Sequence, residues 1–92
     1  MTISEELNNE FILMAKQIEE NIKNNKSFSD DILLKLYGYY KQSVEGDCVT
    51  SSPQFWEIRA KTKWEAWNQH KGMKKEHAMK QYIKYAKLLL KI

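Results

Sequence analysis

Apolar residues recur at steps of three and four in four separate stretches of the chain, which is the spacing of one face of an amphipathic helix. The first stretch predicts a helix that starts almost at the N-terminus, where Thr2 and Glu5 have the spacing of a capping box. Its apolar positions are Ile3, Leu7, Phe11, Met14, Ala15, Ile18 and Ile22. A polar stretch predicts the first loop and contains Asn21, Asn24, Asn25 and Ser27.

The second stretch predicts a helix with Ser29 as its N-cap. Asp30 and Asp31 follow, and their charges complement the positive end of the helix dipole. Gly46 lies just past the last periodic position and is expected to end this helix. The apolar positions between these signals are Ile32, Leu33, Leu36, Tyr37, Tyr40 and Val44.

Two further helices are predicted over residues 58–70 and about 74–90. The start of the third helix is open between residues 53 and 58, because Pro53 after Ser52 can open a helix of its own. Gly72 has the position of a C-cap glycine between the two helices. The apolar faces are Ala60, Trp64 and Trp67 in the third helix, and Ala78, Tyr82, Tyr85, Ala86 and Leu89 in the fourth. No stretch shows a period of two, so the pattern predicts an all-α helix bundle.

The composition agrees with one small domain over residues 1–92. Hydrophobic residues make up 42% and charged residues 29%, and the longest apolar run is the five residues 11–15. A bilayer-spanning helix needs roughly 20 apolar residues, so no stable membrane insertion is expected. The first fifteen residues hold three Glu and no basic residue, unlike a signal peptide, so we expect a cytoplasmic location. Met1 and the four-helix length favour a stand-alone protein.

Enzyme chemistry finds little support in the sequence. The single cysteine, Cys48, excludes an internal disulfide framework and a cysteine-rich zinc site. The two histidines, His70 and His77, are separated by Gly72, and no HExxH, GxSxG or P-loop motif occurs. Adjacent acidic residues splay across a helix and do not converge. We therefore expect no catalytic residue, no metal ion and no cofactor.

The charge of the chain is unevenly distributed. Residues 1–48 hold five Lys against nine acidic residues, a net charge of −4. Residues 49–92 hold ten Lys or Arg against three acidic residues, a net charge of +7. A basic half of this kind either presents a surface to an anionic partner or is an ordinary solvated helix face.

Two tyrosines and a lysine share one face of the second predicted helix. Tyr37, Tyr40 and Lys41 stand at i, i+3 and i+4. A phenol ring offers a stacking surface, and a lysine offers a point charge suited to phosphate. Arg59 and Lys63 stand one turn apart on the third helix, beside its tryptophan stripe. Together these residues fit a flat, apolar and anionic ligand such as a nucleotide; the alternative is that the tyrosines pack at the core edge and the cations are simply exposed.

Three segments resemble the signatures of acyl-CoA-binding proteins. Residues 36–47, LYGYYKQSVEGD, resemble the family's LYxxYKQAxxGD signature. Residues 61–68, KTKWEAWN, resemble its KAKWDAWN block, and residues 72–83 resemble its G…AMxxYI block. Pro53 falls at the family's loop proline, and the spacing between the blocks agrees without insertion.

The resemblance implies a four-helix up-down-down-up bundle that is a monomer and binds medium- or long-chain fatty acyl-CoA esters as an intracellular carrier, without catalysis. It implies five acyl-CoA-binding residues: Tyr37, Tyr40, Lys41, Lys63 and Tyr82. In the family's roles, Lys41, Lys63 and the Tyr37 hydroxyl would contact the ribose 3′-phosphate. Tyr40 would stack on adenine, and Tyr82 would close the site from the last helix. An acyl groove between the first two helices would be lined by Met14, Ala15, Ile18, Leu33 and Leu34.

The sequence also departs from the family pattern. Glu45 occupies a usually apolar position, and Glu19 stands where the first helix often carries a phosphate-binding lysine. The main alternative function is a nucleic-acid-binding helical module, which the basic half and its aromatic residues suggest. The Tyr and Lys residues are compact and split over two helices, so no nucleic-acid partner is expected. A third alternative is a helical interaction domain that has lost its ligand pocket. The retention of all five site positions argues against it.

Overall fold

The computed structural model describes residues 4–24 and 27–92. Every regular element in these residues is an α-helix, so the predicted all-α fold is confirmed. The four helices are α1 (Glu5–Lys23), α2 (Asp30–Glu45), α3 (Ile58–Asn68) and α4 (Lys75–Leu90).

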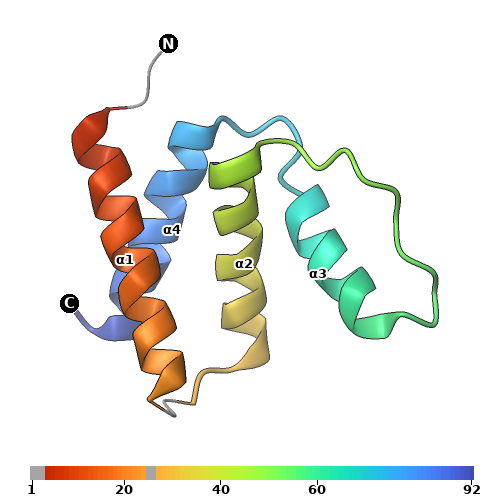
Figure 1. The fold of residues 1–92 in the computed structure, drawn as a ribbon, viewed down its shortest axis with the longest axis horizontal. Helices are drawn as coiled ribbons and strands as arrows, with labels where there is room; N and C mark the ends of the chain where they lie inside the picture. Colours follow the sequence, from red (N-terminus) through yellow and green to blue (C-terminus); the bar gives the residue numbers. More distant parts are fainter. Residues whose placement is uncertain (1–3, 25–26) are drawn as a thin grey trace.

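The helices have the up-down-down-up order that the resemblance implies. In Figure 1, α1 runs downward, α2 and α3 both run upward, and α4 runs downward again. Helices α2 and α3 are parallel because a long connection, residues 46–57, crosses from the end of α2 to the opposite end of the molecule before α3 begins.

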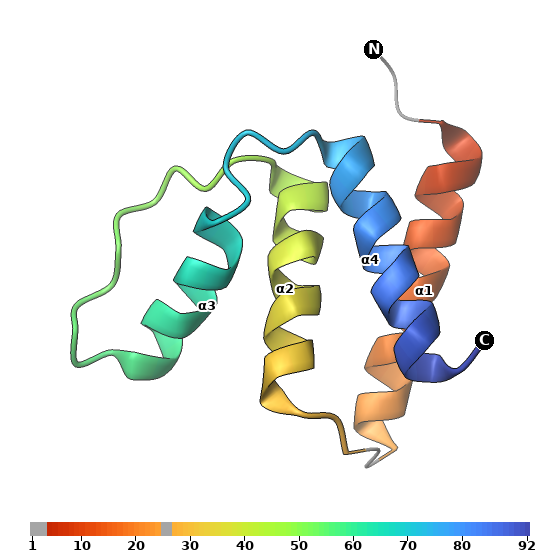
Figure 2. The ribbon, with the colours of Figure 1, turned by 180° about the vertical axis from the view of Figure 1, so that it is seen from behind.

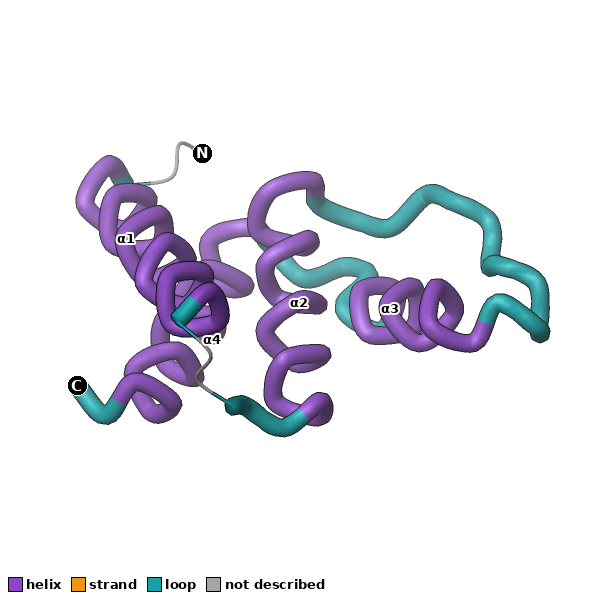
Figure 3. The backbone as a smooth tube through the Cα atoms, turned by 60° about the horizontal axis from the view of Figure 1, so that its bottom comes forward, coloured by secondary structure: helices purple, strands orange, loops and turns teal. Residues whose placement is uncertain are grey.

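The helices form a flat array of 38 × 38 × 16 Å. Helix α4 packs against both α1 and α2, and α2 packs against α3 on its other side. The view from behind in Figure 2 shows α4 lying against α1, and Figure 3 shows α3 beside α2, away from α1 and α4. Helix α2 is therefore covered on two sides, whereas α3 has one helical neighbour.

The predicted capping box at the N-terminus is wrong. Helix α1 begins at Glu5, and its N-cap is Ser4, whose Oγ accepts a hydrogen bond from the Leu7 N–H at 3.1 Å. A serine directly before two glutamates satisfies an open N–H group and complements the helix dipole at the same time. Thr2 and Ile3 lie outside the described residues.

The first helix also ends later than the polar stretch predicts. Asn21 is helical, and its Nδ2 donates to the Gln17 carbonyl oxygen at 2.7 Å. Asn24 is the C-cap, so the loop is shorter than expected at this end. Asn25 lies outside the described residues. The Asn21 amide thus finds a hydrogen-bond partner inside the helix although asparagine is a weak helix former.

The boundary signals of α2 are confirmed. The Ser29 Oγ accepts from the Ile32 N–H at 3.4 Å, and two aspartates occupy the first turn. Gly46 is the C-cap and has a φ of 82°, in the left-handed region that glycine adopts without strain.

The boundaries of α3 resolve one open alternative and correct one prediction. Helix α3 begins at Ile58, so Pro53 does not open a helix. It ends at Asn68, and Gly72 is therefore not its C-cap. Gly72, with a φ of 92°, lies instead in the turn that leads into α4.

The hydrophobic core lies among α1, α2 and α4. Its fully buried members are Phe11, Met14, Ile18, Leu36, Met79, Tyr82, Ile83 and Ala86. The predicted stripes of the first and fourth helices supply most of this cluster, because each of these helices buries one face. Helix α3 contributes its buried residues, Ala66 and Trp67, outside this cluster, against α2 and the preceding loop.

Helix α2 buries small and polar residues that its apolar stripe does not predict: Gly38, Gln42 and Ser43. A side chain at Gly38 would overlap the backbone carbonyl oxygen of Ala66, so the missing Cβ is what allows α3 to approach this closely. The Ser43 hydroxyl donates to the Tyr39 carbonyl oxygen at 2.7 Å within the helix. The apolar period misses these positions because α2 has two covered faces.

Candidate ligand-binding site

A cavity of about 730 Å³ opens between α2, α3 and the C-terminal turns of α1. Its aliphatic lining is Ile18, Ile22, Leu33, Leu34, Leu36 and Ile58. The remaining lining residues are polar or aromatic: Asp30, Tyr37, Tyr40, Arg59, Thr62, Lys63 and Tyr82. The volume is in the range of small-molecule sites, and an apolar lining with a few polar groups is typical of them.

Helical spacing explains why these side chains share one cavity. Leu33, Tyr37 and Tyr40 follow one another by one turn along α2. Ile58 and Thr62 do the same along α3, and Arg59 and Lys63 lie beside them. Helix α2 therefore supplies leucines and tyrosines, α3 supplies Ile58, Thr62 and two cations, and the two helices together line one hollow.

Two lysines and two aromatic rings link α2 to α3 by cation–π contacts. The Lys63 Nζ of α3 lies 4.8 Å from the centre of the Tyr37 ring of α2. The Lys41 Nζ of α2 lies 4.7 Å from a ring centre of Trp67 of α3. Because the helices are parallel, the step of one turn from Tyr37 to Lys41 matches the step from Lys63 to Trp67. The two cation–π contacts therefore lie one helical turn apart along the interface between α2 and α3.

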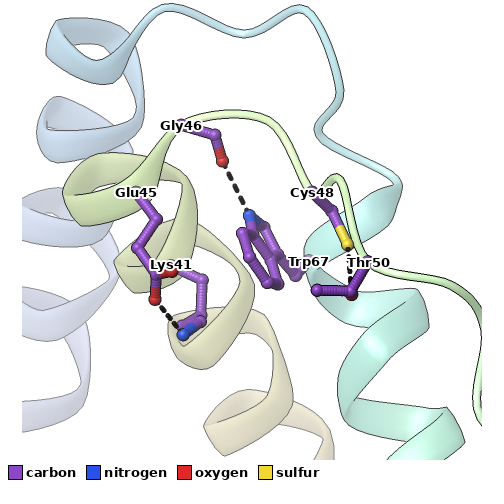
Figure 4. Close-up of polar contacts among 6 residues, drawn as sticks. All are labelled: Lys41, Glu45, Gly46, Cys48, Thr50 and Trp67. Carbon is purple, nitrogen blue, oxygen red and sulfur yellow. Dashed lines mark hydrogen bonds and ion pairs between the residues drawn. The ribbon is translucent and has the colours of Figure 1, made fainter.

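Lys41 also forms an ion pair with Glu45, one turn further along α2. The side chain of Lys41 is 23% exposed and that of Glu45 is 49% exposed. The hydrogen bond that Lys41 donates to Glu45 raises the pKa of Lys41, and partial burial of the ammonium group opposes this shift. Figure 4 shows the pair on α2 with Trp67 facing it from α3.

The tryptophans of α3 hold the long connection after α2. The Trp67 indole N–H donates to the Gly46 carbonyl oxygen at 2.8 Å, and the Trp64 indole N–H donates to the Thr50 carbonyl oxygen at 3.0 Å. Cys48 is buried between these points, with its Sγ 3.4 Å from the Thr50 Oγ1 (Figure 4). Both indoles therefore serve packing and loop attachment, which agrees with a structural role for this stripe.

Gln42 and Asp47 attach the turn before α4 to the end of α2. The Gln42 Nε2 donates to the Asp47 Oδ1 at 2.9 Å and to the Met73 carbonyl oxygen at 2.7 Å. The Gly72 N–H donates to the same Asp47 oxygen at 2.8 Å. These hydrogen bonds, that of Gly72 first, lower the pKa of the Asp47 carboxyl group. Gln42, Asp47 and Gly46 of the signature are therefore occupied with holding the fold, while Tyr37 and Tyr40 line the larger cavity.

Three aromatic rings meet where α1, α2 and α4 come together. Phe11 stacks on Tyr40 with ring centres 5.8 Å apart and meets Tyr82 edge-on at 5.2 Å. Burial raises the pKa of Tyr82 to about 12, so its hydroxyl is neutral at physiological pH. Tyr40 remains 40% exposed and keeps part of its ring accessible.

A second cavity of about 530 Å³ lies on the other side of Tyr40, between α1, α2 and the start of α4. Phe11, Ala15 and Glu19 contribute to it from α1, and Tyr40 lines both cavities. An elongated ligand that passes Tyr40 would therefore have room on both sides of the ring.

The structure brings most of the expected acyl-CoA-binding residues together. Tyr37, Tyr40, Lys63 and Tyr82 line the larger cavity. Lys41 lines neither of the two cavities, because its ammonium group is turned to Trp67 and Glu45.

The expected acyl groove is only partly reproduced. Ile18, Leu33 and Leu34 line the larger cavity. Met14 packs in the core and does not line this cavity. Ala15 lines the second cavity instead. The larger hollow is formed mainly by α2 and α3, and only the last turns of α1 reach it, so the position of the acyl chain stays a prediction.

Several lining residues were not predicted for the groove, chief among them Ile58, Arg59 and Thr62. The sequence did contain a signal for them. Arg59 and Lys63 were already placed on one side of the third helix, and residues 58 and 62 precede them directly with the same spacing of one turn, so they fall on nearly the same side. Asp30 was interpreted as a helix-dipole partner, and it also lies at the cavity.

Across residues 4–24 and 27–92, no helix is long and apolar enough to cross a bilayer. Within the same parts of the chain, no cluster of three or more His, Cys, Asp or Glu side chains is placed to hold a metal ion.

Four helices in this order, with a cavity that joins aliphatic walls to tyrosines and cations, define a small ligand-binding bundle. The chain belongs to the acyl-CoA-binding protein family, because the family model described as "Acyl CoA binding protein" matches residues 8–86. Membership supports acyl-CoA binding in general, and the family is one of binding proteins.

Individual relatives agree with this assignment. Acyl-CoA-binding domain-containing protein 5A of Danio rerio is 42% identical over 78 residues, which are 83% of this chain and 16% of that protein. Acyl-CoA-binding domain-containing protein 5 of Bos taurus is 37% identical over 78 residues, 83% of this chain and 15% of that protein. The chain thus matches less than a fifth of the length of these curated relatives.

A solved structure confirms the fold. The crystal structure of Oryza sativa acyl-CoA-binding protein 2 superposes with a TM-score of 0.83 at 33% sequence identity. The match covers 92% of this chain and 91% of the rice chain.

Proposed function

We propose that this chain binds medium- or long-chain fatty acyl-CoA esters with high affinity and acts as an intracellular carrier that maintains a pool of them. The observation that carries the proposal is the larger cavity, where an aliphatic wall ends at the Tyr37–Lys63 contact. A fatty acyl-CoA has the same division, since an apolar chain is joined to a phosphorylated nucleotide.

The acyl chain supplies most of the affinity in this proposal. Burying one CH₂ group contributes about 0.8 kcal/mol, so a chain of roughly 16 carbons contributes about 12 kcal/mol before ordering costs are subtracted. Leu33, Leu34 and Ile58 offer the apolar surface for this burial from α2 and α3.

The nucleotide end supplies selectivity for CoA esters. Lys63 and the Tyr37 hydroxyl are the proposed contacts of the ribose 3′-phosphate, with Lys41 as a further cation. Tyr40, exposed between the two cavities, is the proposed stacking surface for adenine, and Tyr82 closes the site from α4. Binding and release without a chemical step are sufficient for a carrier, so no catalytic residue is assigned.

A monomeric state and a cytoplasmic location remain predictions from the sequence. The nucleic-acid-binding alternative is not favoured, because the chain belongs to a family of acyl-CoA-binding proteins. The activities of the much longer relatives do not carry over, because the chain spans so little of their length.

Isothermal titration calorimetry tests the proposal directly. Palmitoyl-CoA should bind far more tightly than CoA, palmitate or a random single-stranded oligonucleotide at 150 mM salt. A nucleic-acid module would reverse this order and lose affinity steeply with added salt. Native mass spectrometry of protein purified from cells would then identify the acyl chains that it carries. Micromolar oligonucleotide binding without palmitoyl-CoA binding would overturn the proposal.

A further inference from the structure

Lys41 already has an anionic partner within its own helix. Its ammonium group donates to a Glu45 carboxylate oxygen across one turn of α2. The cation expected at the ligand phosphate is therefore neutralised in this chain before any ligand arrives.

The position of the Lys41 ammonium group is restrained from α3 as well. The ring of Trp67 lies 4.7 Å from it, and the indole N–H of Trp67 is fixed by its hydrogen bond to the Gly46 carbonyl oxygen. Figure 4 shows the Trp67–Gly46 hydrogen bond and the Lys41–Glu45 pair at the end of α2. Lys41 is thus held between a carboxylate and an aromatic face, and it lines neither of the two cavities.

Lys63 is in a different state. Among residues 4–24 and 27–92, no carboxylate lies within ion-pair distance of its ammonium group. It lies over the Tyr37 ring at the wall of the larger cavity. Lys63 is therefore available to an anionic ligand at once, whereas Lys41 becomes available after Glu45 has moved.

We propose that Glu45 is a specificity-determining residue, an internal counter-ion of Lys41 that a ligand phosphate must displace. This inference rests on the proposed function, since it concerns the phosphate of the CoA moiety. Glu45 then lowers the affinity for ligands that carry the 3′-phosphate and leaves the affinity for ligands that lack it unchanged. The preference of the chain for phosphorylated nucleotides is reduced accordingly.

The physical basis is competition between two anions for one ammonium group. A phosphate that approaches Lys41 meets the Glu45 carboxylate at close range, and like charges at this distance repel each other. The Lys41–Glu45 pair is partly exposed, so its strength is modest and a dianionic ligand is able to displace it. The effect is therefore a graded loss of affinity and not a closed site.

The experiment combines one substitution, Glu45→Gln, with two ligands that differ only in the 3′-phosphate. Affinities of the wild type and of Glu45→Gln are measured for palmitoyl-CoA and for palmitoyl-3′-dephospho-CoA at the same salt concentration. Glu45→Gln should bind palmitoyl-CoA about two- to fivefold more tightly, the range expected for one exposed ion pair. Its affinity for the dephospho ligand should be unchanged.

A matched control removes a carboxylate from another ion pair of the same spacing. Glu76 pairs with Lys80 at i, i+4 on α4, with 3.6 Å between Nζ and Oε1. Glu76→Gln should leave both affinities unchanged, which separates a local effect from a change of net charge. Glu45→Ala serves as a second variant, and circular dichroism checks that each variant is folded.

The outcomes are distinguishable. Equal affinity of the wild type and both Glu45 variants for palmitoyl-CoA would overturn the inference and leave the proposed function intact. An equal gain for both ligands would also overturn it, because the 3′-phosphate would then not be the competing group. Failure of the folded wild type to bind either ligand would overturn the proposed function and the inference together.

Discussion

Lys63 of α3 lies over the ring of Tyr37 of α2, with 4.8 Å between Nζ and the ring centre. The contact crosses the interface of two parallel helices at the wall of the larger cavity. One turn further along, Lys41 and Trp67 make the same kind of contact with the roles of the helices exchanged. The cationic end of the candidate site therefore depends on how α3 is seated on α2.

The first prediction concerns Lys63 as a phosphate ligand. Lys63→Ala should weaken palmitoyl-CoA binding by about 1–3 kcal/mol, the scale of a charge-assisted hydrogen bond. The helical circular dichroism signal should stay unchanged, because the side chain is exposed. Titration calorimetry provides the measurement, and Lys80→Ala on α4 is the control for loss of one positive charge. Wild-type affinity in Lys63→Ala would remove Lys63 from the site.

The second prediction locates the acyl chain. Thr62 is exposed on α3 and lines the larger cavity, so Thr62→Trp should fill part of that cavity without disturbing the core. Excluding about two CH₂ groups costs about 1.6 kcal/mol, a loss of more than tenfold in palmitoyl-CoA affinity. The weak binding of CoA itself should fall less than that of palmitoyl-CoA, since CoA has no acyl chain to be excluded from the cavity.

Ala15→Trp is the matched variant for the second cavity. It should leave the difference in affinity between palmitoyl-CoA and CoA nearly unchanged, although overpacking against the core costs about 1–3 kcal/mol of stability. The reverse order, a loss of chain-dependent affinity in Ala15→Trp only, would place the acyl chain in the second cavity.

Local signals were sufficient to predict the helices but not all of their ends. The Ser29 cap and the Gly46 stop act within a few residues, so the sequence shows them directly. At the first helix, Thr2 was predicted as the cap because of its spacing to Glu5, whereas the N-cap is Ser4, which the apolar pattern did not single out. Gly72 is a glycine at a position where a helix end was expected. Its role is set instead by the hydrogen bond that its N–H donates to Asp47, 25 residues earlier in the chain.

The same limit applies to the candidate site: local spacing predicts which residues share a helix face, but it does not predict contacts with other helices. Helical spacing placed Tyr37 and Tyr40 on one face of α2, and the structure has both at the larger cavity. Spacing did not reveal that Lys41 is turned away, because this depends on Trp67 in another helix. Met14 and Ile18 share one apolar stripe and are both buried in the core, but only Ile18, one turn nearer the C-terminal end of α1, also lines the larger cavity.

The third prediction tests the close approach of α3 to α2 at Gly38. Alanine is normally about 1 kcal/mol better than glycine within a helix. Gly38→Ala should nevertheless destabilise the fold by about 1–3 kcal/mol, because the added Cβ overlaps the Ala66 carbonyl oxygen. Chemical denaturation measures the change, and Val44→Ala, at an exposed position of the same helix, is the control.

Ligand affinity should fall in Gly38→Ala as well, because displacement of α3 moves Lys63 away from Tyr37. A stabilised Gly38→Ala variant with normal affinity would show that the two helices do not need this contact.

The last prediction concerns the pH dependence of stability. His70 stacks on Tyr39 with ring centres 4.4 Å apart, and burial lowers its pKa below the ordinary value of 6.5. Below pH 6.5 the unfolded chain therefore binds a proton at His70 that the folded chain does not yet bind. The free energy of unfolding should be at its plateau above this pH and should decrease as the pH falls through 6.5 towards the folded-state pKa.

Urea denaturation at pH 7.5, 6.5 and 5.5 measures this dependence. His70→Phe keeps an aromatic ring against Tyr39 and cannot take up a proton, so its stability should decrease less over this range than that of the wild type. His77→Gln, at an exposed position of α4, should behave like the wild type. The Asp47 carboxyl group acts in a separate window, because its lowered pKa makes its contribution disappear only below about pH 3.8. Parallel curves for the wild type and His70→Phe would exclude His70 as the source of the acid sensitivity.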